Sequence, residues 1–224
     1  MTEFSQAIQT VAVYAIPVLF AISLHEAAHG YVARYFGDPT AHEMGRLSVN
    51  PTRHIDPFGT ILLPLILYLT IHMPFGYAKP VPVDYGRLRN PKKQMGFVAA
   101  AGPLANLAMG LGWMVWLVLM RGMGIDEPFL IKMAIAGVNV NAIMCVFNLL
   151  PIPPLDGGRI LTALLPNGLA RRYARIEQYT PWIFLGLLVA MYFNLLSPLL
   201  SGMVGLFIEL LALLVLPLQM LLNS

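Results

Sequence analysis

Residues 21–36, AISLHEAAHGYVARYF, hold three ionisable side chains, His25, Glu26 and His29, inside a long apolar run. Positions i and i+4 of an α-helix lie one above the other on one face, so His25 and His29 present two imidazole nitrogens to one point. Glu26 is offset by one residue and can reach a water at that point without binding an ion there. The segment therefore predicts a helix with a metal site on one face.

The five residues HEAAH have the H-E-x-x-H spacing in which two histidines bind zinc and the glutamate serves as general base. Near the centre of a membrane helix, each ionisable group costs roughly 2.5–3.5 kcal/mol, and a bound cation offsets that cost. A His/Glu cluster that joins two helices, or a proton relay, is the alternative interpretation. We favour one zinc ion with His25 and His29 as ligands.

The composition of the chain is that of a membrane protein. Of its 224 residues, 58% are hydrophobic and 11% are charged, which is too little charge to cover the surface of a soluble domain. The net charge of +3 fits Lys and Arg in cytoplasmic loops, and we expect no nucleic-acid partner. The single cysteine, Cys145, excludes a disulfide within the chain and a cysteine-based zinc site. The first twenty residues lack a basic start and a cleavage signal, so we expect the N-terminus to be retained.

Apolar runs of about 20 residues, the length that crosses a bilayer, occur at four or five places. The first covers about 6–35, the second 94–121 and the third 129–150. Residues 181–222 are almost continuously apolar apart from an interruption at NLLSP. They predict a hairpin of two helices with Pro198 at the turn.

Residues 58–72 decide the number of spans. The stretch is apolar but only about 15 residues long and contains Pro64, which favours an element that dips into the membrane and returns. In that case five helices cross, the N-terminus lies outside, the C-terminus lies inside, and the basic loops share the cytoplasmic side. A six-span arrangement, in which 58–72 crosses, is the alternative. The weak alternation of GRLSVN, residues 45–50, predicts a short strand.

Together these elements predict an all-α polytopic membrane protein with five to six transmembrane helices and a small membrane-associated β element. We expect one membrane-embedded domain over 1–224, with a core at about 6–160 and additional C-terminal helices at about 181–222. The HEAAH turn precedes Arg34 by little more than one helical turn, which places the metal nearer the cytoplasmic face than the membrane centre.

A catalytic zinc site needs a third protein ligand and one open position for water. Asp156, in the segment NLLPIPPLDGGR, is the remaining acid at membrane depth. Three prolines end the preceding helix, and Gly157 and Gly158 permit an unusual backbone that turns the carboxylate inward. An N-cap for the short helix that follows is the alternative role of this aspartate. We expect Asp156 to be the third ligand.

Several other polar residues have less specific roles. His54, in TRHIDP, is a candidate for stabilising an oxyanion or orienting a ligand, although a loop histidine more often does neither. For Asn106 we expect close helix packing or a hydrogen bond to the core. Asn139 and Asn141 either line the cavity or form hydrogen bonds between helices.

Three motifs occur in order along the chain: HEAAH at 25–29, AAGPLAN at 100–106 and NLLPIPPLDGG at 148–158. Together they resemble the site-2 protease family of intramembrane zinc metalloproteases. The resemblance covers about residues 20–160, whereas the last two helices match only as hydrophobic spans.

The resemblance implies a zinc-dependent intramembrane endopeptidase that hydrolyses peptide bonds within or near transmembrane segments of membrane proteins. It implies one Zn²⁺ per chain held by His25, His29 and Asp156, with Glu26 acting on a zinc-bound water. Asn148 fills the family's asparagine position and would hold the substrate backbone near the metal.

Similar proteins carry a membrane-embedded β element on the cytoplasmic side that pairs with an extended substrate. Residues 40–50 or a hairpin at 58–83 are its candidate counterparts. No PDZ-like domain fits between the second and third motifs, so the resemblance leaves the mode of substrate selection open. We expect a multi-pass protein of a bacterial or archaeal cell membrane, with a transmembrane protein as substrate and its active site near the cytoplasmic face. A metal-binding scaffold or a metal transporter without protease activity is the alternative function.

Overall fold

The computed structural model of the protein describes residues 3–63, 66 and 79–222, and the regular structure within them is helical throughout. Four helices are long and apolar enough to cross a membrane: α1 (Glu3–Tyr35), α4 (Pro91–Gly122), α5 (Pro128–Asn148) and α9 (Ser197–Leu222). The shorter elements are α2 (Thr40–Glu43), η1 (Pro51–Arg53), η2 (Pro57–Leu62), η3 (Tyr85–Arg87), α6 (Asp156–Leu164), α7 (Asn167–Ala174), η4 (Arg175–Tyr179) and α8 (Thr180–Tyr192).

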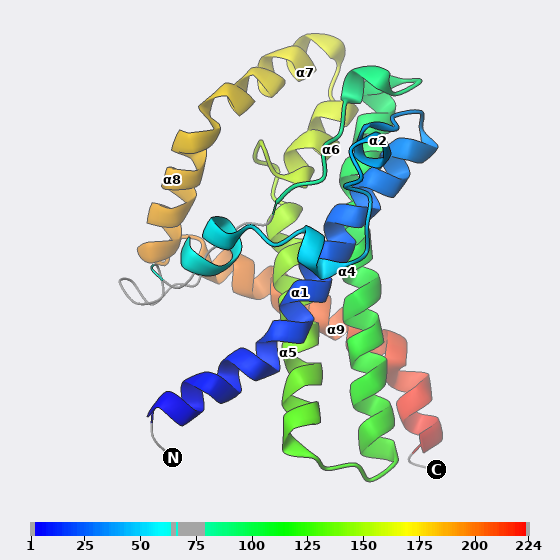
Figure 1. Cartoon of the computed structure of the whole chain (residues 1–224), viewed down its shortest axis with the longest axis vertical. Coiled ribbons are helices and arrows are strands. Elements are labelled where there is room, and N and C mark those ends of the chain that lie inside the picture. The colour runs from blue at the N-terminus through cyan, green and yellow to red at the C-terminus, as the bar shows by residue number, and fades with distance from the viewer. Residues whose placement is uncertain (1–2, 64–65, 67–78, 223–224) are drawn as a thin grey trace.

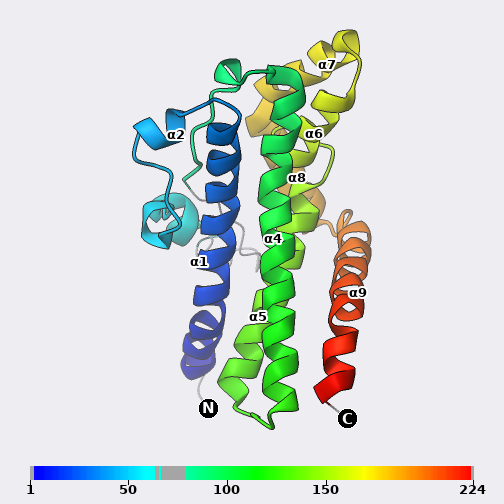
Figure 2. The same ribbon diagram turned by 90° about the vertical axis from the view of Figure 1, so that its right-hand side faces the viewer.

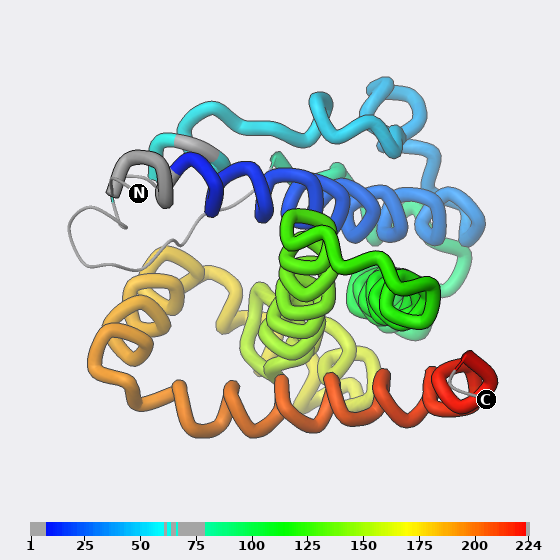
Figure 3. The backbone as a smooth tube through the Cα atoms, turned by 90° about the horizontal axis from the view of Figure 1, so that it is seen from below, coloured from blue at the N-terminus to red at the C-terminus, as the bar shows by residue number. Residues whose placement is uncertain are grey.

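Helix α4 is the centre of the bundle and contacts α1, α5, α6 and α9. Viewed from below, α1 lies on one side of α4 and α5, and α9 crosses on the other side (Figure 3). An apolar cluster that includes Val138, Ala142, Phe207 and Leu211 joins α5 to α9. The bundle is therefore layered, with α4 and α5 between α1 and α9 (Figure 2).

The two ends of the bundle differ. The N-terminal end of α1, the C-terminal end of α9 and the connection between α4 and α5 lie together at one end (Figure 1). Helices α2 and α7 and the start of α4 lie at the other end. Both chain ends thus lie on the same side, whereas the five-span prediction places them on opposite sides.

The region 181–222 differs from the predicted hairpin. It contains two helices, but α8 has only 13 residues, about 20 Å, and is too short to cross roughly 30 Å of hydrocarbon. The chain bends at 193–196, where Asn194 has a positive φ, and α9 continues toward the lower end instead of folding back along α8 (Figure 1). Pro198 lies in the first turn of α9, where proline fits, and not at the bend. The counts of five and six spans are therefore not confirmed.

The predicted β element is also not confirmed. Residues 46–50 are irregular, and no strand is present among residues 3–63 and 79–222. The start of 58–72 forms the single-turn π-helix η2, capped by the Asp56 carboxylate, which accepts a hydrogen bond from the Gly59 amide. Most of the rest of 58–72, and the middle of the hairpin proposed at 58–83, lie outside the described residues.

An irregular segment before α4 is held against the end of α1. Asp38 is almost fully buried, and its carboxylate accepts hydrogen bonds from the amides of Thr40 and Asp84. The Arg89 guanidinium donates to the carbonyls of Tyr35 and Phe36, which have no helical partner at the end of α1. These contacts position the segment beside the HEAAH turn.

Candidate metal centre

Three ligand-type side chains from two helices meet inside the bundle. His25 and His29 lie one turn apart on α1, as their spacing predicts, and Asp156 is the first residue of α6. The two Nε2 atoms of His25 and His29 are 3.1 Å apart. Asp156 Oδ2 lies 3.2 Å from His25 Nε2 and 3.4 Å from His29 Nε2. His25 and Asp156 are 5% and 6% exposed. The structure thus brings together the three residues that the sequence nominates as ligands.

The triangle formed by these atoms fits one zinc ion. Tetrahedral ligands at about 2.0–2.1 Å from zinc are separated from one another by about 3.3–3.4 Å. The three observed separations lie within about 0.3 Å of that value. Asp156 Oδ2 is buried and, among the residues the structure describes, accepts no hydrogen bond. A buried anionic oxygen without a donor is a group that a cation would satisfy.

Hydrogen bonds on the far side of each imidazole determine which nitrogen faces the centre. His29 Nδ1 lies 2.8 Å from the carbonyl oxygen of Val98, which can only accept, so Nδ1 carries the proton. His25 Nδ1 lies 2.5 Å from Asn106 Oδ1. In the neutral form of each ring, Nε2 then carries a lone pair directed at Asp156. Three electron-pair donors at one buried point are the arrangement that a metal ion requires.

Two asparagines form a buried network behind His25. Asn106 Nδ2 donates to Asn141 Oδ1 at 2.9 Å, and Asn141 Nδ2 donates to the Gly137 carbonyl at 2.8 Å. Neither asparagine has any exposed surface. Asn106 forms the hydrogen bond to the core that the sequence predicts, and Asn141 has the second of its two predicted roles, a hydrogen bond between helices, but their link to a ligand was not anticipated. The sequence feature that could have indicated this link is the motif AAGPLAN, because it places the polar side chain of Asn106 in an apolar helix.

Close packing of α4 against α1 depends on Gly102. A Cβ atom there would lie 2.5 Å from His29 Nε2 and 2.6 Å from His25 Nε2, so any side chain would fill the metal centre. This contact gives a physical reason for the glycine of AAGPLAN. It also marks the depth of the centre along α4, 11 residues after Pro91 and 20 residues before Gly122.

The segment NLLPIPPLDGG folds back so that α6 starts beside the end of α5. A Cβ atom on Gly157 would lie 2.2 Å from the Leu149 carbonyl oxygen, and one on Gly158 would lie 2.6 Å from the Pro153 nitrogen. The two glycines thus permit the close approach that turns Asp156 inward. The N-cap of α6 is Leu155, without a side-chain cap, so the structure does not use Asp156 in the alternative role of N-cap. Its position in the first turn places a negative charge at the positive end of the helix dipole.

Glu26 lies beside the ligands but contacts a different group. Its side chain is half-buried, and Oε2 accepts a hydrogen bond of 2.7 Å from the Val81 amide. Val81 belongs to the irregular segment between residue 79 and η3. The glutamate carboxylate therefore faces the backbone of this irregular segment.

The two remaining candidate residues have local partners. Asn148 is the last residue of α5, half-buried, and its Nδ2 donates to the Met144 carbonyl. His54 is 1% exposed, follows η1, and has Nε2 at 2.7 Å from the Ser48 carbonyl oxygen. It is not part of the three-residue cluster that could hold a metal. In this structure His54 holds loop segments together.

A cluster at the upper end connects α6 to its neighbours. Arg159 on α6 donates to the hydroxyl of Tyr85 and to the carboxylate of Glu177, and its guanidinium lies over the Tyr85 ring. Burial raises the pKa of the Tyr85 phenol above its ordinary value, and the Arg159 charge opposes that rise. The cluster joins η3, α6 and η4 above the metal centre.

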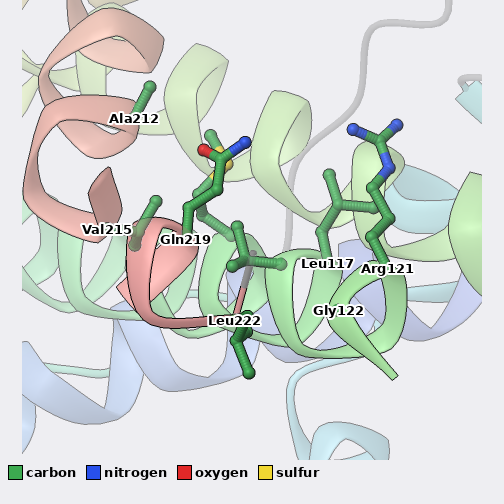
Figure 4. Close-up of a pocket in the computed structure, with 9 residues that line it drawn as sticks. Leu117, Arg121, Gly122, Ala212, Val215, Gln219 and Leu222 are labelled. Carbon is green, nitrogen blue, oxygen red and sulfur yellow. The ribbon is translucent and has the colours of Figure 1, made fainter. Parts of the chain in front are cut away.

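A separate pocket of about 280 Å³ lies between the lower ends of α4 and α9. Figure 4 shows Arg121 and Gln219 beside it, among apolar side chains such as Leu117 and Val215. Leu117 follows Gly102 by 15 residues, about 22 Å along the helix, so this pocket is remote from the three ligands.

Comparisons with known proteins agree with this site. A family model described as "Peptidase family M50" matches residues 13–136 and 127–192. A relative from Bacillus subtilis (strain 168), named "Putative zinc metalloprotease YwhC", is 37% identical over 179 residues, or 78% of this chain and 78% of that protein. Proteins named "Putative zinc metalloprotease Rip2" from Mycolicibacterium smegmatis and Mycobacterium tuberculosis are 29% identical, and the aligned parts cover 79% of this chain and 66% of theirs. No solved structure matches the chain.

Proposed function

The chain belongs to peptidase family M50 and is a multi-pass zinc metalloprotease, and we propose that it cleaves peptide bonds within or beside transmembrane helices of other membrane proteins. One observation carries the proposal: ligand atoms from buried His25 and Asp156 and from partly buried His29 converge, at separations of 3.1–3.4 Å, inside a bundle whose long helices are apolar enough to lie in a bilayer. A metal site in that position acts on peptide groups at membrane depth.

We assign one Zn²⁺ to His25 Nε2, His29 Nε2 and Asp156 Oδ2. When bound, zinc with an open position lowers the pKa of a water toward neutrality and polarises a carbonyl. The residues around the ligands support this assignment. Val98 and Asn106 hold the two imidazoles with Nε2 toward the centre, and Gly102 leaves space beside them.

Glu26 is our candidate for the general base. It would take a proton from the attacking water and pass it to the leaving amine. The position of Glu26 supports this role, because it follows His25 directly on α1 and its carboxylate already accepts a hydrogen bond from the Val81 amide of an irregular segment. A substrate that is unwound near the metal would present the same kind of backbone to this carboxylate.

We also propose that Asn148 binds the substrate backbone. It ends α5 immediately before the turn that leads to Asp156, and its amide currently bonds within its own helix. For His54 the buried bond to Ser48 supports a role in loop structure, and we do not assign it a contact with substrate.

We place the site near the cytoplasmic face. The end of the molecule with α2, α7 and the start of α4 carries most of the basic side chains, which the positive-inside rule assigns to the cytoplasm. Gly102, which contacts both imidazoles, is about 16 Å along α4 from Pro91 and about 30 Å from Gly122. The metal centre is therefore nearer the basic end.

Replacing Glu26 by Gln tests the mechanism and separates it from a scaffold or transporter. The test uses proteoliposomes that contain a fluorescently tagged single-span membrane protein, with Glu209→Gln on the exposed face of α9 as a matched control. We expect Glu26→Gln to retain zinc and to lower the cleavage rate about 10²–10⁴-fold, while Glu209→Gln cleaves normally. Normal cleavage by Glu26→Gln contradicts the general-base role. Zinc binding without cleavage by any variant favours the scaffold.

A single test substrate does not represent the substrates of a cell. We therefore compare membrane-protein fragments in cells that express the wild type with those in cells that express Glu26→Gln. Fragments that require the wild type, and whose new ends map within or beside transmembrane helices, are the expected result. New ends confined to soluble domains contradict the proposed substrate class.

A further inference from the structure

We propose that Asn106 and Asn141 are positioning residues for the metal: together they set the tautomer and ring orientation of His25. The relay runs through three helices, from α5 through α4 to α1. The inference rests on the proposed zinc site but not on the identity of the substrate.

The relay consists of three consecutive hydrogen bonds among buried groups. Asn141 donates to the Gly137 carbonyl one turn earlier on α5, and Asn106 on α4 donates to Asn141. Asn106 then accepts from His25 Nδ1 on α1. The Asn106 amide nitrogen also lies 3.4 Å from the Ala21 carbonyl oxygen on α1.

The chemistry of these groups fixes which one donates and which one accepts in each of the three hydrogen bonds. A backbone carbonyl can only accept, so the Asn141 atom that faces Gly137 is its NH₂, and its oxygen faces Asn106. Asn106 must therefore donate its NH₂ to that oxygen, which leaves Asn106 Oδ1 toward the imidazole. His25 Nδ1 then carries a proton, and Nε2 presents its lone pair to the metal centre. The orientation of the His25 ring thus depends, through Asn106 and Asn141, on the Gly137 carbonyl of α5.

His29, the second histidine, is oriented by a single hydrogen bond. His29 Nδ1 donates directly to the Val98 carbonyl, in one step and without a side chain that mutation can remove. His25 depends on two side chains, and both are fully buried, where an amide left without a partner is strongly unfavourable. The alternative is that the two asparagines serve only to join the helices. That alternative predicts changes in stability without a specific change at the metal.

Two substitutions at Asn106 separate these possibilities. Asn106→Leu removes the acceptor for His25 Nδ1, whereas Asn106→Asp keeps an acceptor oxygen and loses the NH₂ group that faces Asn141 and the Ala21 carbonyl. Both break the link between α4 and α5. We expect Asn106→Leu to weaken zinc binding about 10–100-fold and Asn106→Asp to keep it within about threefold of the wild type. Zinc affinity is measured by competition with a chelator on the purified full chain in detergent.

Asn141→Ala extends the test to a residue that does not contact His25. We expect it to weaken zinc binding by about 3–10-fold, less than Asn106→Leu, because the Asn106 amide loses the partner that orients it. Asn139→Ala is the matched control, since Asn139 lies on the same helix, is half-buried and is outside the relay. Its zinc affinity should equal that of the wild type.

Gel filtration and thermal unfolding without zinc show whether each variant folds. A second measurement, of the histidine tautomers, needs no metal. ¹⁵N NMR of histidine-labelled protein reports the tautomer of each imidazole, and Asn106→Leu should alter the His25 signals while leaving those of His29 unchanged. Equal zinc affinities for the wild type, Asn106→Leu and Asn141→Ala overturn the proposal, as does an unchanged His25 tautomer. If the wild type binds no zinc, the proposed metal site fails, and the NMR result still decides whether the relay orients His25.

Discussion

Glycines in the bundle around the metal centre and glycines in α8 and α9 meet opposite surroundings. A Cβ atom on Gly102 or Gly157 would overlap an imidazole or a backbone carbonyl, at 2.2–2.6 Å. A Cβ atom on Gly186, Gly202 or Gly205 would meet nothing within 4 Å. Close backbone contact is thus a requirement around the ligands and is absent at these C-terminal positions.

Buried polar groups follow the same division. The buried polar and charged side chains in the described ranges all lie at or before residue 156, and four of them, His25, Asn106, Asn141 and Asp156, belong to the candidate metal centre and the hydrogen bonds behind it. Helix α9 instead buries Phe207, Leu211 and Val215 against the bundle. Hydrogen bonds require fixed distances and directions, whereas apolar contacts tolerate small shifts. The first region is built to hold a geometry, and the second packs against it.

The largest expected contrast comes from neutralising one acid in each region. Asp156→Asn removes an anionic ligand and should weaken zinc binding more than about 100-fold, beyond the 10–100-fold typical of residues behind the ligands. Glu209→Gln changes an exposed side chain in the middle of α9 and should leave zinc affinity unchanged. Chelator competition measures both. Similar losses in the two variants would contradict the division between the regions.

Removal of the metal should lower stability only when the ligands in the bundle around the metal centre are intact. A ligand that binds the folded state stabilises it by about 2.7 kcal/mol at a free concentration 100 times its Kd. A chelator should therefore lower the thermal unfolding temperature of the wild type and of Glu209→Gln by the same amount. Asp156→Asn, already without zinc, should not respond, and a full response in this variant would place the stabilising metal elsewhere.

Adding one methyl group to a glycine in each region compares their packing directly. Gly157→Ala places its Cβ against the Leu149 carbonyl and should destabilise the protein by about 1–3 kcal/mol. Gly205→Ala adds a better helix former in open space and should be neutral or stabilising by up to about 1 kcal/mol. Thermal unfolding in detergent measures both changes. A neutral Gly157→Ala would show that the turn before α6 is more adaptable than its contacts indicate.

The smallest expected effect concerns the cluster at the junction of η3, α6 and η4. Burial raises the pKa of Tyr85, so the folded state keeps this proton at pH values where the unfolded chain, with an ordinary pKa near 10, has released it. The wild type should therefore lose stability as the pH rises above about 10. Tyr85→Phe has no phenol that titrates at position 85. The difference in unfolding free energy between the wild type and Tyr85→Phe should therefore narrow as the pH rises above about 10. Unfolding temperatures at pH 8–11 measure the trend, and a constant difference would contradict it.

Sequence patterns predicted the three candidate ligands that the structure brings together and the long helices, but not the C-terminal arrangement. The spacing of His25 and His29 determines their common face because helix geometry is local, and apolar length identifies the spans for the same reason. The interruption near NLLSP was predicted, but the open bend at 193–196 and the short α8 were not, since an apolar run does not specify how two helices are oriented. The strand at 45–50 was proposed from weak alternation, and no partner strand lies beside it in the part of the chain that the structure describes.

The order of the amino acids is enough to identify the available donors: two imidazoles one turn apart, a glutamate beside them, and an aspartate framed by prolines and glycines. The packing of the helices shows that Asp156 meets His25 and His29, that Gly102 faces their rings, and that Asn106 connects His25 to α5. The physical reason is distance along the chain. Contacts within one helical turn follow from backbone geometry, whereas contacts between residues about 80 to 130 positions apart depend on how α1, α4, α5 and α6 pack together.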